Sequence, residues 1–241
     1  MQIKPVAIQK FDKLKPYNTD NKLNLKNFLQ NKHFTKIPND CYKANFLPFA
    51  GLKTVGEAYV IDRKTGEKVK AAIKKDEIKD EYCLYKLYKD KKELGAMDMS
   101  PYSRIPNTIG GKPVNAGKYH KMVIPKIEHI RTIEGDKYSR IGSTLVNLAI
   151  EESKKYGFGG GLWLFSEKGF QKMLSLYRSN KNPIPFYYKL GFRALGEEDE
   201  KIKEYINNYE YAKLPNSAIL VLDSETVKKG NKYLEPDFVL N

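Results

Sequence analysis

A tight loop between two apolar segments, from Ile127 to Ser143, holds the residues best placed to do chemistry. The apolar run I-E-H-I-R-T-I-E is typical of a strand and stops at Gly135, and a second apolar periodicity begins at Ile141. A helix that begins there presents backbone N–H groups without intrahelical partners, together with the positive end of its dipole. The sequence therefore predicts that the loop and the helix start bind a phosphate group.

The helix after this loop has clear limits in the sequence. Apolar residues recur with helical spacing from Ile141, Lys154 and Lys155 suit the last turn, and Gly157 stops the helix. The apolar run 161–166 that follows predicts a buried strand. Strand, helix and strand form a β-α-β crossover, so we expect the two strands to be parallel neighbours with a right-handed connection.

A second cluster, N-K-N-P-I-P-F-Y-Y-K-L-G-F, covers residues 180–192. Its spacing predicts a short helix with Phe186, Tyr187 and Leu190 on adjoining faces and Gly191 as the C-terminal stop. A tyrosine near a helix end is often a core residue, so this pattern alone does not assign chemistry to Tyr187.

The two segments together resemble the GNAT superfamily of N-acetyltransferases, which bind acetyl-CoA and pass its acetyl group to an amine. The stretch Phe186–Phe192 matches the family's Tyr-x-Lys-Leu-Gly-Phe ending, and Tyr82–Met99 resembles its central hairpin, with Gly95 on the second strand. The resemblance spans roughly residues 82–223. It implies an α/β fold with a mostly antiparallel, twisted mixed sheet, one parallel strand pair and flanking helices.

The family's pyrophosphate loop falls on residues 137–142, with two departures. Lys137 stands where the family has Gln or Arg, and Arg140 replaces the first glycine of the pattern, whereas Gly142 matches the second. A residue with a Cβ atom seldom takes a left-handed conformation. The loop must therefore either keep φ negative at Arg140 or accept strain there.

The resemblance also implies catalytic roles. Tyr187 matches the family's general acid, and an ordinary tyrosine pKa of about 10 keeps its hydroxyl protonated at neutral pH. Tyr188 is the weaker candidate because it points elsewhere on the helix. Glu128 is our candidate for the general base, although the alignment puts Lys126 nearer to one catalytic position and many family members use a water relay instead.

The same resemblance implies the residues that bind acetyl-CoA. The strand before the loop would hold the pantetheine arm, the loop and the helix start would hold the pyrophosphate, and Asn180 stands where the family often has Asn. The predicted cofactor-binding residues are Ile130, Thr132, Ile133, Lys137, Tyr138, Ser139, Arg140, Ile141, Gly142, Ser143 and Asn180.

The implied function is transfer of an acetyl group from acetyl-CoA to a primary amine of a small molecule or a peptide. Two alternatives remain open. The first is the same chemistry on aminoacyl-tRNA, as in toxin-like members of the family. The second is a non-catalytic module that binds CoA or nucleic acid, which the departure at Arg140 favours. The resemblance leaves the oligomeric state open and is compatible with a dimer.

Composition agrees with a soluble globular protein. The chain has 241 residues, 41% of them hydrophobic, which is enough to bury the core of one domain. It has no apolar run that could span a membrane and no secretory leader, so we expect a cytoplasmic protein without a membrane partner. Its two cysteines and three histidines have no metal-binding spacing, so we expect no metal.

The net charge of +14 exceeds what the phosphates of a coenzyme need. RNA is one partner that would explain the excess. The other explanation is a lysine-rich solvated surface, which we favour because no RNA-binding motif is present.

The domain organisation follows from these assignments. We expect a basic N-terminal extension at 1–55 that holds a short helix at 20–32, a GNAT-like domain at 56–225 and a C-terminal tail at 226–241. Within the domain, the sequence predicts a hairpin turning at Gly66, a long loop at 100–118, an amphipathic helix at 197–211 and a last strand at 217–222. The helical pair that the family usually places after its first strand is not visible.

Overall fold

The structure is a computed structural model, and it describes residues 51–78, 82–109, 111–168 and 182–241. These residues belong to one compact unit, Phe49–Asn241. Asn180 and the helix predicted at 20–32 lie outside the described residues, as does most of the predicted extension 1–55. Among the described helices, none is long and apolar enough to cross a membrane.

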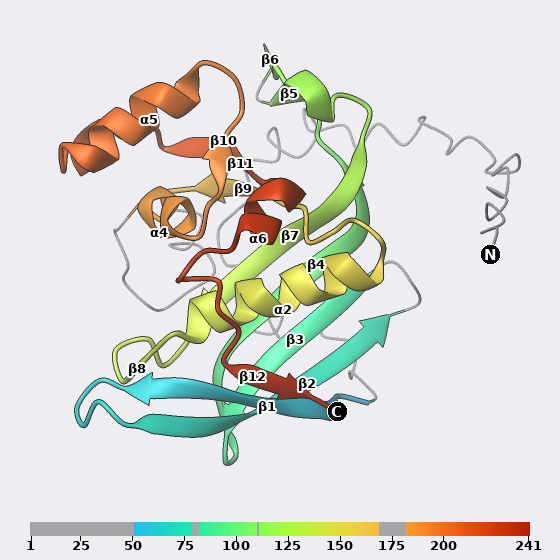
Figure 1. The fold of residues 1–241 in the computed structure, drawn as a ribbon, viewed down its shortest axis with the longest axis vertical. Helices are drawn as coiled ribbons and strands as arrows, with labels where there is room; N and C mark the ends of the chain where they lie inside the picture. Colours follow the sequence, from blue (N-terminus) through green and yellow to red (C-terminus); the bar gives the residue numbers. More distant parts are fainter. Residues whose placement is uncertain (1–50, 79–81, 110, 169–181) are drawn as a thin grey trace, which may run out of the picture. The chain divides into compact units, whose positions relative to one another are not determined.

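Ten strands form a single sheet in the described part of the chain (Figure 1). All paired neighbours are antiparallel except β7 and β9. The mixed, mostly antiparallel α/β fold expected from the sequence is therefore confirmed. Across the sheet the strands are β10 (Arg193–Ala194), β11 (Ser217–Leu222), β9 (Leu162–Glu167), β7 (Val123–Thr132), β4 (Lys92–Arg104), β3 (Tyr82–Lys89), β2 (Lys68–Ile78), β1 (Lys53–Asp62) and β12 (Phe238–Leu240), with β8 (Tyr138–Ser139) also paired to β1.

The parallel pair is short. Strands β7 and β9 pair only at Lys126–Trp163 and Ile127–Leu164. Beyond these positions each strand continues toward its C-terminal end without pairing to the other. The β9-facing edge of β7 therefore carries backbone N–H and C=O groups that the sheet does not use.

Glu128 sits at a bulge immediately after this parallel pairing. In the ladder between β4 and β7, Asp98 pairs with His129 and Met99 pairs with Ile127, so Glu128 is an extra residue on β7. A bulge of this kind bends a strand and changes the direction of the neighbouring side chains.

Helix α2 (Ile141–Lys155) lies across one face of the sheet and packs on β3, β4, β7 and β9 (Figure 1). Leu145 and Leu148 are fully buried in this layer. Gly95 of β4 allows the helix to come close, because a Cβ atom there would lie 2.6 Å from Cγ2 of Ile141. A smaller core with Trp163 and Ile219 lies on the opposite face, since these residues alternate with those that face α2.

The segment 100–118 differs from the long loop predicted for it. Residues 100–104 continue β4, and the rest forms a small hairpin of β5 (Thr108–Ile109) and β6 (Lys112–Pro113) followed by the 3-10 helix η2 (Gly117–Tyr119). Pro101 favoured a loop over a strand in the sequence, because proline has no backbone N–H to donate to a neighbouring strand. The structure accommodates it because the pairing of β4 with β7 shifts register between Ser100 and Ser103, where a missing N–H breaks no ladder bond.

Strands β1 and β2 form the predicted hairpin, with Gly66 in its turn at a φ of 75°. The turn joins the two strands directly, so no helix lies between them. The predicted amphipathic helix is α5 (Glu198–Asn207), which begins with three acidic residues and precedes the 3-10 helix η3 (Tyr211–Lys213).

The C-terminal residues are part of the fold rather than the tail that we predicted. After β11 comes α6 (Ser224–Lys229), whose N-cap Asp223 accepts a hydrogen bond from the backbone N–H of Glu225. The chain then crosses α2 and adds β12 to the edge of β1 (Figure 1). Strand β11 is therefore not the last strand, and the short β12 has too few residues to show a periodicity.

Candidate functional site

One pocket gathers most of the residues that the sequence assigned to cofactor binding. It has a volume of about 640 Å³ and lies where the end of β7, the loop 132–140, the start of α2, helix α4 (Ile184–Lys189) and the C-terminal segment meet. The predicted residues that line it are Ile130, Thr132, Tyr138, Ser139, Arg140, Ile141, Gly142, Ser143 and Tyr187. Ile133, Lys137 and Glu128 are not among its lining residues.

The loop that leads into α2 is fastened to strand β1. Strand β8 pairs with the end of β1, and the backbone N–H of Arg63 donates to the carbonyl of Lys137 at 2.8 Å. The guanidinium of Arg63 also donates to the carbonyl of Gly135 at 2.8 Å. These bonds hold the loop in one position beside the pocket.

The N-terminus of α2 opens on the pocket without a side-chain cap. The N–H of Thr144 donates to the carbonyl of Arg140 at 2.9 Å, which closes the first turn. In the described part of the chain, the N–H groups of residues 141–143 have no such partner. They and the positive end of the helix dipole can therefore bind an anion.

Arg140 has a strained backbone conformation, which was one of the two alternatives that the sequence left open for this loop. Its φ is 69°, in the left-handed region, at the position where the family pattern has glycine. Its guanidinium lies 3.1 Å from a carboxylate oxygen of Asp237, which also lies 3.1 Å from the ammonium of Lys68. Arg140 thus faces the pocket while paired with an acidic residue of the C-terminal segment.

This backbone conformation leads to a stability prediction. We expect Arg140→Gly to have a free energy of unfolding about 1 kcal/mol higher than Arg140→Ala, because both variants lose the ion pair with Asp237 and only glycine takes a positive φ without strain. Chemical denaturation of the two variants measures the difference. Equal stability would show that residue 140 does not keep a left-handed conformation in solution.

Gly142 is needed for close contact between α2 and α4. A Cβ atom on Gly142 would lie 3.1 Å from Cζ of Phe186. Phe186 is partly exposed and lines the pocket beside the helix start. The family-like glycine therefore has a packing role in this chain as well.

Tyr187 lies in the same pocket on α4. The residue is 6% exposed, and its ring contacts Phe186 and Phe192 edge-on, with ring centroids 5.1 and 5.5 Å away. Its hydroxyl makes no hydrogen bond within the described residues, and burial raises its pKa above the ordinary range. Tyr187 is therefore a protonated donor at the wall of the pocket.

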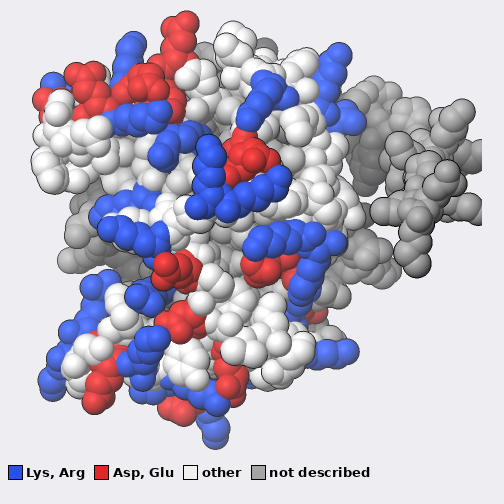
Figure 2. Space-filling view, in the orientation of Figure 1, with Lys and Arg blue, Asp and Glu red and all other residues white. Residues whose placement is uncertain are grey.

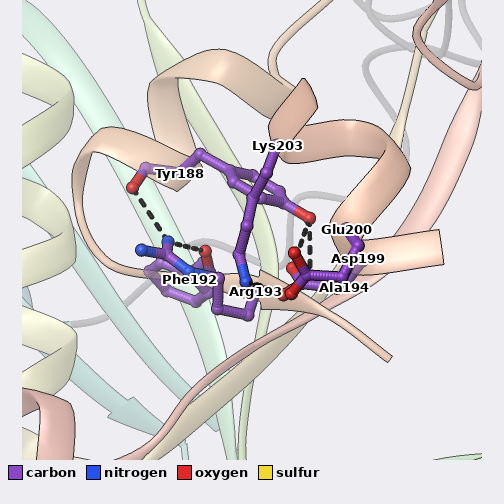
Figure 3. A network of polar contacts seen from close by, with 7 residues as sticks. All are labelled: Tyr188, Phe192, Arg193, Ala194, Asp199, Glu200 and Lys203. Carbon is purple, nitrogen blue, oxygen red and sulfur yellow. Dashed lines mark hydrogen bonds and ion pairs between the residues drawn. The ribbon is translucent and has the colours of Figure 1, made fainter. Parts of the chain in front are cut away.

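Tyr188, the weaker candidate, has a different environment (Figure 3). Its hydroxyl donates to a carboxylate oxygen of Asp199 at 2.7 Å and accepts from the N–H of Ala194 at 3.1 Å. The guanidinium of Arg193 lies 5.3 Å from its ring centroid and donates to the Tyr188 carbonyl. These contacts join α4 to β10 and α5, so the hydroxyl of Tyr188 is already used in the structure.

The pocket thus joins an uncapped helix start, two arginines and a protonated tyrosine. No family model matches the chain, and no curated protein matches it. The chemistry assigned to the pocket therefore rests on these groups and on the motifs that they form. Within the described residues, no group of three or more His, Cys, Asp or Glu side chains could hold a metal ion.

Glu128 does not line the pocket that Tyr187 lines. It accepts a hydrogen bond from Ser100 at 2.9 Å and forms an ion pair with Lys126. Ser100 and Asp98 alternate along β4 with Met97 and Met99, which belong to the core under α2, so this cluster is on the opposite face of the sheet. The structure does not bring the two predicted catalytic residues together in one pocket.

The region around Glu128 contains a pair that the sequence reading missed. Nδ1 of His129 lies 3.1 Å from a carboxylate oxygen of Asp98, which also accepts a hydrogen bond from Tyr82. The hydrogen bond to Asp98 raises the pKa of His129. Asp98 is on β4 and His129 is on β7, and the bulge on β7 shifts the pairing between these two strands. No local pattern in the sequence therefore indicated that Asp98 and His129 are in contact.

Proposed function

We propose that this protein is a GNAT-like N-acetyltransferase that transfers the acetyl group of acetyl-CoA to a primary amine of a small molecule or a peptide. The observation that carries the proposal is that the uncapped start of α2 and the hydroxyl-bearing ring of Tyr187 line one pocket beside the end of β7, where β7 no longer pairs with β9. The family-like spacing of the loop 137–142 and the ending Phe186–Phe192 supports it.

The pyrophosphate would bind at the start of α2. The N–H groups of residues 141–143 supply donors, and the helix dipole favours negative charge at this end. Arg63 and Arg140 also line the pocket. A bidentate guanidinium binds phosphate strongly, so Arg140 compensates in part for the glycine that it replaces.

The pantetheine arm would lie along β7. Ile130 and Thr132 line the pocket, and from residue 128 onward no described strand pairs with the β9-facing edge of β7. An extended ligand with amide groups can add to such an edge as a further strand would. This placement would bring the thioester close to the bulge at Glu128.

The chemistry then requires a proton donor and a neutral amine. Tyr187 would protonate the departing thiolate, since its buried hydroxyl keeps its proton at physiological pH. Glu128 would take a proton from the amine only if the acceptor approached from the opposite face of the sheet. A water relay is the alternative, because Glu128 does not line the pocket.

The anion site can be tested with a variant that separates binding from folding. We expect Ser143→Asp to raise the Kd for CoA by about 100-fold, because two like charges about 4 Å apart near a protein surface repel each other by several kcal/mol. The same carboxylate stabilises the first turn of a helix, so the melting temperature should not fall. Isothermal titration and thermal denaturation measure the two effects.

Ser143→Asn is the matched control, because it has nearly the same size without the charge, and it should bind CoA almost as wild type does. Ser143 suits this test better than Gly142, where any side chain would press on Phe186. An unchanged Kd for CoA in Ser143→Asp would show that the pyrophosphate does not bind at the start of α2.

A second candidate is a module that binds CoA without transferring the acyl group. The position of Glu128 outside the pocket favours it. Release of CoA from acetyl-CoA in the presence of a panel of amines separates the two functions. Tight binding of CoA without thioester cleavage by any amine would support the module.

A further inference from the structure

The C-terminal segment after α6 forms a wall of the pocket. This segment crosses α2 on its way to β12 (Figure 1). Its residues Lys232, Tyr233, Glu235 and Asp237 line the pocket. The wall is anchored at both ends. The side chain of Asn231 donates to the carbonyl of Lys189 at 2.9 Å, and the carbonyl of Asp237 accepts from the N–H of Tyr59 at 2.8 Å.

Two more bonds fix the shape of the segment between these anchors. The N–H of Leu234 donates to the carbonyl of Asn231 at 2.7 Å, and the N–H of Tyr233 donates to the Asn231 side chain at 2.9 Å. This tight turn sets the positions of Lys232 and Tyr233 next to the end of α4. Preorganised groups bind a ligand at a lower entropic cost than mobile ones.

Lys189 and Lys232 are the two lysines that line the pocket, one on α4 and one on the C-terminal segment. Both are exposed, and neither forms an ion pair with a carboxylate of the described residues. Many of the other lysines have such a partner, and basic side chains alternate with acidic ones on this face of the molecule (Figure 2). Two unneutralised ammonium groups at one rim of a pocket suit a phosphate dianion.

Tyr233 adds an aromatic surface beside these cations. Its side chain is 47% exposed, and the ammonium of Lys232 lies 5.1 Å from its ring centroid. A nucleobase can stack on an exposed aromatic ring of this kind. The combination of a ring and two lysines matches a nucleotide with a terminal phosphate.

We propose that Lys189 and Lys232 bind the 3'-phosphate of CoA and that Tyr233 stacks on its adenine. The inference rests on the proposed function, since it assigns the other end of the same coenzyme. The pyrophosphate lies at the start of α2, and the nucleoside end extends from there toward the C-terminal segment. Asp237 does not oppose this placement strongly, because the ammonium of Lys68, which does not line the pocket, pairs with it at 3.1 Å.

The test compares CoA with dephospho-CoA, which lacks only the 3'-phosphate, by isothermal titration at low ionic strength. We expect wild type to bind CoA about 10-fold to 100-fold more tightly than dephospho-CoA, the range for hydrogen bonds to a charged group. The double variant Lys189→Ala/Lys232→Ala should bind the two ligands about equally. Its affinity for dephospho-CoA should stay near that of wild type.

Lys201→Ala is the matched control, because Lys201 is an exposed lysine of α5 that does not line the pocket. It should keep the wild-type preference for CoA. Tyr233→Ala should weaken the binding of CoA and of dephospho-CoA by a similar factor. Tyr233→Phe should leave the affinity for both ligands unchanged.

The outcomes separate this inference from the proposed function. Equal binding of CoA and dephospho-CoA by wild type would overturn the inference and leave the proposed function standing. A preference for CoA over dephospho-CoA that the double variant retains would have the same consequence. Absence of binding for both ligands would overturn the function itself.

Discussion

Tyr187→Phe should lower kcat by about 100-fold to 10,000-fold, the range for loss of a general acid. The Kd for acetyl-CoA should change little, because the ring remains and the lost hydroxyl makes no hydrogen bond within the described residues. The reason is chemical: a thiolate leaves poorly without a proton, and Tyr187 is a buried tyrosine at the wall of the pocket whose hydroxyl makes no hydrogen bond within the described residues. Steady-state kinetics with saturating amine and a separate titration with CoA measure the two quantities.

The stability of this variant provides the control. Removing a buried hydroxyl that has no partner is close to neutral for folding, so the melting temperature of Tyr187→Phe should stay near that of wild type. Tyr188→Phe should instead lower stability, because it removes the bonds to Asp199 and Ala194, and it should leave kcat almost unchanged. Unchanged turnover in Tyr187→Phe would exclude this residue as the acid.

Glu152→Ala should destabilise the fold by about 3–5 kcal/mol, the range for breaking a buried ion pair from one side. The side chain of Glu152 is only 2% exposed. It accepts hydrogen bonds from Tyr85 at 2.6 Å, from Lys75 at 3.0 Å and from Lys155 at 2.8 Å. Its loss leaves the largely buried ammonium of Lys75 with less neutralising charge beneath α2.

The matched control for this variant is the neighbouring residue Glu151. It pairs with Lys154 at the surface of the same helix, so Glu151→Ala should cost at most about 1 kcal/mol. Urea denaturation of both variants compares the losses. Similar losses would show that the buried cluster does not stabilise the position of α2.

The lowered pKa of Glu152 also predicts how the free energy of unfolding depends on pH. Burial alone would raise the pKa of Glu152, but the hydrogen bonds from Lys155, Tyr85 and Lys75 outweigh burial and hold the pKa below its ordinary value. A depressed pKa stabilises the folded state above the unfolded pKa of about 4.3, and this contribution is lost as the pH falls through the folded value. The acid limb of the stability curve should therefore be shallower in Glu152→Gln than in wild type.

The elements with local signals were predictable from the sequence. Helix α2 begins at Ile141 and ends at Lys155, as its apolar periodicity indicated, and Gly157 has the positive φ of a helix stop. Gly191 likewise ends α4 with a φ of 93°. In both cases a few adjacent residues determine the boundary, so one sequence is sufficient to find it.

Features that depend on distant residues were not predictable. Strand β12 has only three residues and pairs with β1 far away in the sequence, where Gly56 leaves room for the backbone of Val239. The bulge at Glu128 arises from the register with β4, which no local pattern encodes. For the same reason Lys232 and Tyr233 could not be assigned to the pocket, because they reach it only through the path of the C-terminal segment.

Strand β1 sets the spacing between two walls of the pocket. One wall is the loop 132–140, which is attached to β1 through β8 at Ile61 and Asp62. The other wall is the C-terminal segment after α6, which is attached to β1 through β12 at residues 56–58. Three residues of extended chain from Ala58 to Ile61 span about 10 Å. The separation of these two attachment points is therefore a property of one strand, and a movement of β1 would carry both walls together rather than part them.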